Sequence, residues 1–343
     1  MAKEKLLDQK PELATNPQRI IDLFFGYSPT FVLATAVQLE VFTALTSGAL
    51  TAPDVAKATS SSPRGMAMLL DALVSLGLLD KQANRYALTP DSEAYLVRGK
   101  DGYLGGFFDF LQGNLQSWLR LTQAVKSGDP IHKMEDQSGS EEFFPPLIRS
   151  LHVANMAPAH SLTRKLGVGT RWRGLKILDV GAGSGVWGIA AAVEDPSATV
   201  TALDFPRILG ITREYAAKAG VGDRFSYLEG NMREAALEEN TYDLAILGNI
   251  CHSEGADATR AFLKRLQPAM RAGGKVAIID MVPNEDRTGP SFPLVFALEM
   301  LINTAQGGTF TQGEYSRWLQ EAGFKKVEAV DIRFHSPVIV AQK

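Results

Sequence analysis

The stretch KILDVGAGSGVWG, residues 176–188, decides the fold. Its first five residues form the apolar run of a short buried strand, and glycines follow at 181, 183 and 185. A glycine turn between a strand and a helix lets a ligand approach the backbone closely, and the helix N-terminus behind it favours an anionic group. The glycines alone do not identify the ligand, because dinucleotide enzymes carry G-x-G-x-x-G and this turn reads G-x-G-x-G followed by Gly188.

Short apolar runs recur after this turn, and segments long enough for a helix separate them. The runs lie at residues 199–203, 225–229, 242–247 and 274–279. This alternation predicts an α/β fold with a doubly wound, Rossmann-like sheet. Two more strands are expected at 327–332 and 337–341. Because only four residues join them, we expect an antiparallel hairpin that completes a mixed seven-stranded sheet.

The chain before residue 100 has a different pattern. Residues 17–46 have helical apolar spacing with a break near 26–29, which predicts two helices. Thr51 and Ser62 are N-cap residues that each precede a further helix. Residues 78–89 then read as two short strands around a polar turn. Helices followed by a small hairpin predict a mostly helical winged-helix domain.

A winged helix can bind DNA, so the charges of this region decide between DNA and protein partners. Residues 17–100 carry seven basic and seven acidic side chains, and the candidate recognition helix, 63–77, has one basic residue, Arg64. Because phosphate neutralisation supplies most non-specific DNA affinity, we expect no nucleic-acid binding. The apolar excess indicates a subunit interface instead.

Length and composition limit the remaining possibilities. A chain of 343 residues exceeds one ordinary hydrophobic core, and a net charge of −3 gives no field that attracts nucleic acid or anionic lipid. Cys251 is the only cysteine, which excludes an intramolecular disulfide and suits a reducing compartment. The leader, residues 1–16, has no apolar run of signal-peptide length, and no stretch elsewhere is expected to reach the roughly 18 apolar residues of a membrane span. We therefore expect a cytoplasmic protein without a membrane partner.

Three regions follow from these patterns. Residues 1–100 are expected to form the winged-helix domain, residues 101–168 a helical linker, and residues 169–343 the ligand-binding α/β domain. The linker is rich in aromatic residues, which favours core packing and leaves a lid over the site as the alternative.

Asp204 gives the glycine turn its meaning. The turn begins with an acidic residue, Asp179, and Asp204 ends the second strand 25 residues later. A carboxylate at the end of that strand can accept hydrogen bonds from both hydroxyls of a ribose. The turn resembles the first motif, E/D-x-G-x-G-x-G, of the class I S-adenosylmethionine (SAM) dependent methyltransferases. From about residue 17 onward the chain resembles the small-molecule O-methyltransferases of the plant caffeate type and of the bacterial antibiotic and carotenoid types, which dimerise through an N-terminal winged helix. The motifs that carry this resemblance are at 177–185, 203–206, 229–232, 251–252, 273–276 and 307–311.

The resemblance implies SAM as the cofactor, S-adenosyl-L-homocysteine as its product, a homodimer and a small-molecule acceptor. Gly181 and Gly183 would lie against the methionine part of SAM, Asp204 would bind the ribose, and Phe205 would pack against the adenine. At position 231 an asparagine replaces the usual aspartate. The full set of implied cofactor residues is Asp179, Gly181, Gly183, Gly185, Asp204, Phe205, Asn231, Met232 and Asn249.

His252 and Asp280 are the catalytic residues that the resemblance implies. His252 follows the fourth strand, where open α/β sheets place ligands, and resembles the family's catalytic base, whereas Asp280 matches the acid that orients it. The chain departs from the family at Ser253-Glu254, which replaces Asp-Trp, and at Gly248, which replaces a lysine. In 307–311 the family's second glutamate is missing.

The acceptor is the least specified part of the function. The resemblance places Asn155, Met156, Met300 and Asn303 against it, and no histidine pair with a carboxylate at metal-ligand spacing accompanies them, so no metal is expected. Methylation of an aromatic or polyketide-like hydroxyl, with His252 as base, is the leading hypothesis. Methylation of a tetrapyrrole or keto-acid carbon, or of a thioether sulfur such as that of a methylthio-hydroxybutyrate, needs no base and stays open. A regulator that binds SAM without turnover is the third hypothesis.

Overall fold

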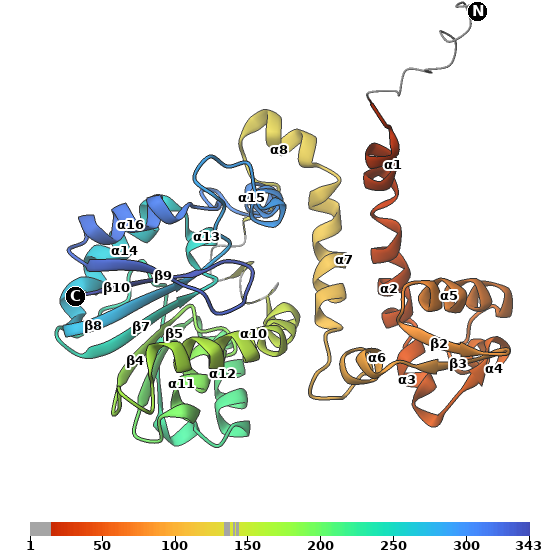
Figure 1. Ribbon diagram of the computed structural model, residues 1–343, viewed down its shortest axis with the longest axis horizontal. Coiled ribbons are helices and arrows are strands. Elements are labelled where there is room, and N and C mark those ends of the chain that lie inside the picture. Colours follow the sequence, from red (N-terminus) through yellow and green to blue (C-terminus); the bar gives the residue numbers. More distant parts are fainter. Residues whose placement is uncertain (1–14, 134–137, 140, 142–143) are drawn as a thin grey trace, which may run out of the picture. The chain divides into compact units, whose positions relative to one another are not determined.

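The structure, a computed structural model, describes residues 15–133, 138–139, 141 and 144–343 (Figure 1). Most of the charged leader, residues 1–14, lies outside them. The chain divides into two compact units, Met1–Gly105 and Gly106–Lys343, which are described separately.

The first unit has the predicted winged-helix pattern. Its helices are α1 Gln18–Phe25, α2 Ser28–Gln38, α3 Val41–Ala44, α4 Ala52–Ala58, α5 Pro63–Ser75 and α6 Pro90–Tyr95, with a 3-10 turn η1 at Leu45–Ser47. Strands β2 Leu79–Gln82 and β3 Arg85–Leu88 form the expected hairpin, and β1 Leu50–Thr51, which was not foreseen, pairs with β3. Thr51 begins α4 through a capping box with Asp54, as its position predicts.

Helices α1 and α2 carry an unusual apolar surface. Leu23 is 74% exposed and Phe24 66% exposed. Together the two helices, Gln18–Gln38, form a 21-residue segment that contains an 18-residue window with a mean hydropathy of 1.6, long and apolar enough to cross a membrane by length and composition only. The expectation that no stretch reaches this length was therefore wrong. A single such segment near an N-terminus is weak evidence for a membrane span, and α1 and α2 are separate helices interrupted at Gly26 and Tyr27.

The second unit is built on a seven-stranded sheet in the order β6-β5-β4-β7-β8-β10-β9, which confirms the predicted fold class. The strands are β4 Lys176–Val180, β5 Thr199–Asp204, β6 Phe225–Glu229, β7 Tyr242–Gly248, β8 Met270–Ile279, β9 Lys325–Val330 and β10 Val338–Gln342. The first five are parallel, and β10 runs antiparallel to both β8 and β9. The hairpin is therefore confirmed, although β9 ends two residues earlier than expected and the connection is longer than four residues.

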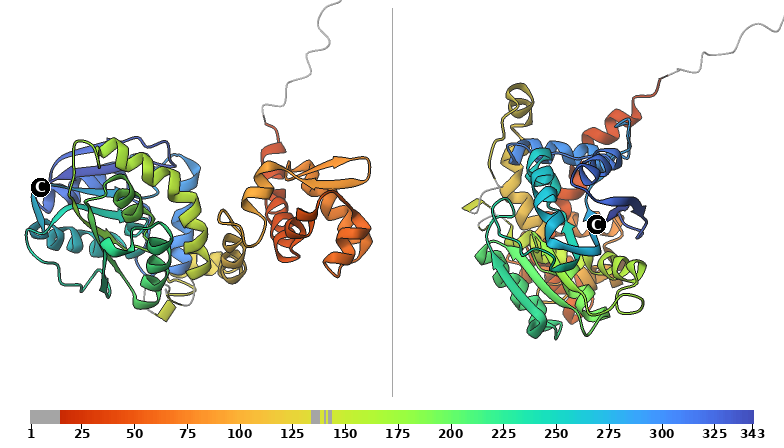
Figure 2. Two further views of the ribbon diagram at one scale, coloured as in Figure 1. Left: turned by 90° about the horizontal axis from the view of Figure 1, so that it is seen from below. Right: turned by 90° about the vertical axis from the view of Figure 1, so that its left-hand side faces the viewer.

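Helices cover both faces of this sheet (Figure 2), and alternating side chains of the strands pack into the two cores beneath them. Ile177 and Ile246 face one core, with α10 Pro145–Leu166 and α11 Val186–Glu194, whereas Leu178 and Leu247 face the other. That second core contains α14 Ala256–Ala269 and α16 Gln312–Glu321. The remaining helices are α7 Gly106–Trp118, α8 Leu121–Ser127, α12 Pro206–Lys218, α13 Cys251–Glu254 and α15 Ser291–Asn303, with a 3-10 turn η2 at Gly222–Arg224. Because both faces are covered, a polar site can form only at the ends of the strands.

Candidate active site

The glycine turn lies between β4 and α11 and needs its glycines for two reasons. Gly181, Gly183 and Gly185 all have positive φ angles, between 57° and 73°. A Cβ atom at Gly181 would lie 2.9 Å from the Ile250 side chain, and one at Gly185 would lie 2.7 Å from Thr212. At Gly183 a Cβ would lie 3.8 Å from the Ile148 side chain, an ordinary contact, so here the positive φ and not a clash favours glycine.

Asp204 is brought onto the same turn by two backbone bonds. Its Oδ2 accepts a hydrogen bond of 2.8 Å from the Gly183 amide, and its Oδ1 accepts one of 2.8 Å from the Phe205 amide. Burial raises the pKa of Asp204 to about 6. Because an ionised carboxylate offers about four acceptor positions, each oxygen keeps one for a ligand hydroxyl.

Asp179 faces the helix rather than the open side of the turn. Its Oδ2 accepts a hydrogen bond of 3.0 Å from the Gly188 amide in α11, and burial raises its pKa to about 7. A Cβ at Gly188 would lie 2.9 Å from this carboxylate oxygen, so the glycine admits the aspartate. Asp179 therefore braces the turn from behind.

The other predicted cofactor residues surround the turn in different ways. Phe205 precedes α12 and is half-buried, and Asn231 accepts a hydrogen bond of 2.8 Å at Oδ1 from the Arg233 amide. The side chain of Met232 is buried in the core beside α14. Asn249 has a φ of 58°, and its Oδ1 is buried without a partner among the described residues. An orphaned acceptor beside the turn fits a site that binds a polar ligand.

His252 and Asp280 meet at the ends of β7 and β8. The His252 Nδ1 lies 2.5 Å from Asp280 Oδ1, and the His252 amide donates to Asp280 Oδ2 at 3.0 Å. Both residues are buried. Because an ionised carboxylate only accepts hydrogen bonds, Nδ1 carries the proton and Nε2 has a free lone pair. The structure thus brings together the two residues that were predicted to be catalytic, in direct contact.

The departures from the family pattern have local explanations. A Cβ at Gly248 would lie 2.4 Å from the Trp187 indole Nε1, so the indole occupies the space that a lysine would need. The Ser253 hydroxyl donates to the Ile250 carbonyl at 2.9 Å, and Glu254 accepts a hydrogen bond of 2.6 Å from Arg233.

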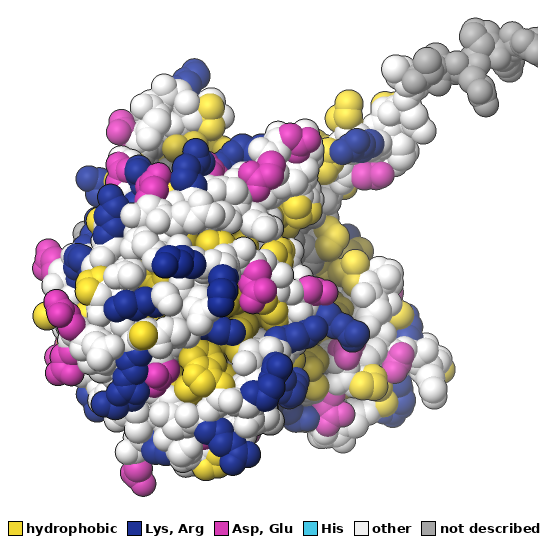
Figure 3. Space-filling view, turned by 60° about the vertical axis from the view of Figure 1, so that its left-hand side comes forward, with side chains coloured by type: hydrophobic (Ala, Val, Ile, Leu, Met, Phe, Trp, Pro, Cys, Tyr) yellow, Lys and Arg dark blue, Asp and Glu magenta, His cyan; other side chains and the backbone are white. Residues whose placement is uncertain are grey.

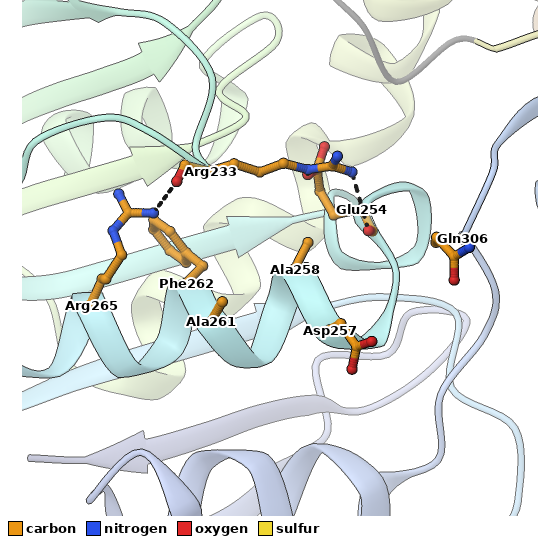
Figure 4. Close-up of a pocket in the computed structure, with 8 residues that line it drawn as sticks. All are labelled: Arg233, Glu254, Asp257, Ala258, Ala261, Phe262, Arg265 and Gln306. Carbon is orange, nitrogen blue, oxygen red and sulfur yellow. Dashed lines mark hydrogen bonds and ion pairs between the residues drawn. The ribbon is translucent and has the colours of Figure 1, made fainter.

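Arg233 and Glu254 border a pocket along α14 (Figure 4), whose volume is 340 Å³. His252 and the glycine turn do not line it. Arg265, on its wall, donates to the backbone carbonyls of Met232, Arg233 and Ala235, so several of its donors are already used within the protein. The pocket is therefore separate from the site predicted from the sequence.

On the acceptor side, the structure adds residues that the sequence analysis missed. Glu299 of α15 accepts hydrogen bonds from Asn114 and Trp118 of α7 and from Asn303 of α15. Of the predicted acceptor residues, Met300 and Asn303 are buried on this helix, and Asn155 and Met156 lie on α10. The one signal in the sequence was a charged residue inside the apolar helix SFPLVFALEMLIN.

Two further residues were also missed. Tyr315 of α16 donates a hydrogen bond to Asp280, and His152 of α10 lies 3.0 Å from the Ser184 hydroxyl of the glycine turn. No group of three or more His, Cys, Asp or Glu residues that could hold a metal ion occurs within the part of the chain that the structure describes.

The strand order, with its last strand inserted antiparallel, and the glycine turn at the strand ends define a SAM-dependent methyltransferase. A model of the O-methyltransferase domain matches residues 170–325, and a model of the O-methyltransferase dimerisation domain matches residues 21–98. The chain belongs to this O-methyltransferase family.

Several relatives match along almost the whole chain. The chain is 29% identical to 3-hydroxy-5-methyl-1-naphthoate 3-O-methyltransferase of Streptomyces sahachiroi, over 95% of this chain and 94% of the relative. It is 30% identical to acetylserotonin O-methyltransferase of Bos taurus, over 88% and 90% of the two chains. A solved structure of a candidate O-methyltransferase from Nostoc punctiforme PCC 73102 is 30% identical and superposes with a TM-score of 0.85 over 96% and 99%. The predicted class of enzyme is confirmed.

Proposed function

We propose that this protein transfers the methyl group of SAM to a hydroxyl of a small aromatic or polyketide-like acceptor, with His252 as general base. The observation that carries the proposal is the 2.5 Å contact between His252 Nδ1 and Asp280 Oδ1, which leaves Nε2 as a proton acceptor. Relatives that act on a hydroxynaphthoate and on acetylserotonin support an aromatic hydroxyl.

The chain's own residues account for the proton. SAM supplies a methyl group on a sulfonium sulfur, and the acceptor oxygen displaces that sulfur in line. His252 Nε2 takes the hydroxyl proton as the oxygen–methyl bond forms and the sulfur–methyl bond breaks. Asp280 holds Nδ1 and stabilises the imidazolium. The products are the methyl ether and S-adenosyl-L-homocysteine.

The cofactor fits the polar groups around the glycine turn. Asp204 would accept the two ribose hydroxyls at its free positions, and the backbone of the turn at Gly181 and Gly183 would lie against the methionine part. Phe205 and Asn231 would border the adenine, and the orphaned Asn249 oxygen would accept a ligand donor. Asp179, Gly181, Gly185 and Met232 would shape the turn from behind and below it.

The partner of the first unit would be a second copy of this chain. The exposed apolar side chains of α1 and α2, together with the family's dimerisation-domain match at 21–98, support a homodimer that covers them, with 1–100 as the dimerisation domain. On the face shown in Figure 3, basic and acidic side chains are interspersed, which supports neither nucleic acid nor an anionic membrane as a partner. We infer a cytoplasmic enzyme. Light scattering should give a dimer mass, and Phe24→Glu should yield monomers.

The test of the activity is methyl transfer from labelled SAM to a panel of phenols. His252→Asn should lower kcat by about 10²- to 10⁴-fold, as expected for a lost general base. His160→Asn is the matched control, because His160 lies on α10 and pairs with Glu194 of α11 rather than with Asp280. A similarly small decrease of kcat in both variants would contradict the role of His252 as general base.

The same panel separates the alternatives. Transfer to keto-acid carbon or to a thioether sulfur, with little loss in His252→Asn, would favour C- or S-methylation. Binding of S-adenosylhomocysteine without turnover of any acceptor, together with a DNA shift at low salt, would favour the regulator.

A further inference from the structure

Glu299 lies among hydrogen-bond donors that are all neutral. Its Oε1 accepts from Asn303 Nδ2 at 2.7 Å and from Asn114 Nδ2, and its Oε2 accepts from the Trp118 indole at 2.5 Å. In the described part of the chain, none of its bonding partners carries a charge. Burial raises the pKa of Glu299, whereas these hydrogen bonds lower it.

Two acceptor positions of this cluster remain without donors. A carboxylate offers about four acceptor positions, and three are used, so one is left on Oε2. The Asn303 Oδ1 is buried and has no partner among the described residues. Glu299 itself is only half-buried, so a ligand can reach it. The cluster therefore has spare hydrogen-bond acceptors, and a ligand that fits it would supply a hydrogen-bond donor.

A purely structural clamp between α7 and α15 would not need a charge. Taking a carboxylate partly out of water without a cation beside it is unfavourable. Neutral amides could join the two helices without that cost, as the bond of 3.0 Å between Asn303 and Asn114 already does. A carboxylate at this position is therefore better suited to bonding a donor from outside the cluster than to joining the two helices.

The position of Glu299 on the same helix as Phe296, which contacts His252, indicates that such a donor would belong to the methyl acceptor. Phe296, one turn earlier on α15, packs edge-on against the His252 ring with centroids 5.0 Å apart, and Phe292 stacks on Phe296 at 6.0 Å. Residues three apart on a helix are neighbours, so Glu299 lies one helical turn beyond the Phe296 ring that packs against His252. An acceptor that extends from His252 past Phe296 to Glu299 would suit the size of a bicyclic aromatic compound with a short side chain.

We propose that Glu299 determines the specificity for the acceptor by accepting a hydrogen bond from an amine or other N–H group at the end remote from the methylated hydroxyl. The acceptor would then be a hydroxylated aromatic compound with a nitrogen donor. This inference rests on the proposed function, because His252 defines the other end of the acceptor.

The test compares two probes that differ in one group. They are 6-(2-aminoethyl)-2-naphthol and 6-propyl-2-naphthol, whose side chains have the same length. Binding of each is measured by calorimetry with S-adenosylhomocysteine present, so the result does not depend on turnover. The wild type should prefer the amine by about 10- to 100-fold, the range for one hydrogen bond to a charged group.

Variants assign that preference to Glu299. Glu299→Gln should lose the preference through weaker binding of the amine and leave the propyl probe nearly unchanged, whereas the exposed control Glu321→Gln should behave as wild type. Trp118→Phe removes one hydrogen-bond donor to Glu299 but keeps its charge, so this variant should keep or increase the preference for the amine probe. It provides an independent test should Glu299→Gln fold poorly.

Two sets of results would overturn the inference. Equal binding of both probes, or no binding of either, would contradict the nitrogen donor. Equal weakening of both probes in Glu299→Gln, with the preference lost in Trp118→Phe, would assign a structural clamp. Absence of methyl transfer to any phenol, with the binding preference intact, would contradict the proposed function instead.

Discussion

Tyr315 donates a hydrogen bond of 2.8 Å from its hydroxyl to Oδ2 of Asp280, the carboxylate that contacts His252. The ring is completely buried in the core beneath α16, whose first turn is held by a capping box between Thr311 and Glu314. Burial, followed by the charge of Asp280, raises the pKa of Tyr315 well above its usual value, so the hydroxyl remains a donor. Tyr315 thus positions the acid in a chain that lacks the family's second glutamate.

Replacing Tyr315 by Phe should change the pH dependence of methyl transfer. Without this donor, the Asp280 carboxylate is less neutralised and stabilises the protonated form of His252 more strongly. The acidic limb of the kcat/KM profile should therefore move to higher pH, and the free energy of unfolding should fall by about 1 kcal/mol. Tyr86→Phe is the matched control, because Tyr86 makes the same 2.8 Å bond to Asp71 in the other unit. An unmoved profile with lower stability would leave Tyr315 a structural role only.

Cofactor binding should depend on pH through Asp204. Its pKa is raised to about 6, chiefly by burial, so the carboxyl group becomes protonated as the pH falls below that value. A protonated carboxyl loses an acceptor position for the ribose hydroxyls. The affinity for S-adenosylhomocysteine, measured by calorimetry, should weaken from pH 7.5 to pH 5. Asp204→Asn should bind about 10- to 100-fold more weakly at pH 7.5 and show a flatter pH dependence. Constant wild-type affinity over this range would argue against Asp204 as the ribose ligand.

The parts of the site that could be predicted from the sequence are those set by local order. The glycine turn and Asp204 each end a strand, and parallel neighbouring strands bring their carboxyl ends together, so Asp204 had to meet the turn. His252 and Asp280 follow the same rule for β7 and β8. Glu299 and Trp118 lie 181 positions apart on helices outside the sheet. No periodicity relates such residues, because their contact depends on how the helices pack in three dimensions.

Side-chain packing explains the glycine at position 248, which the sequence alone left unexplained. A Cβ atom added at Gly248 would lie only 2.4 Å from Nε1 of the Trp187 indole. Gly248→Ala should therefore lower the free energy of unfolding by about 1–3 kcal/mol through overpacking. The double variant with Trp187→Leu should lose less than the two single variants combined, because the smaller side chain makes room. Chemical denaturation of all four proteins measures this coupling, and additive losses would mean that the backbone adjusts instead.

His152 should make the stability of the second unit depend on pH. It lies 3.0 Å from the Ser184 hydroxyl and stacks on Tyr215 with ring centroids 3.8 Å apart. Burial, with a smaller contribution from the charge of Lys218, lowers its pKa from 6.5 to about 4. The unfolded chain then binds a proton that the folded chain does not bind between these two values. The contribution of His152 is complete above pH 6.5 and is lost as the pH falls toward 4.

The size of this contribution can be measured against a variant that cannot titrate. His152→Asn keeps a polar group near Ser184 and removes the ring. Urea unfolding of both proteins between pH 7 and pH 4.5 should show the wild type losing about 1–3 kcal/mol more than the variant over this range. Parallel curves for wild type and His152→Asn would mean that His152 takes up a proton in the folded state as readily as in the unfolded one.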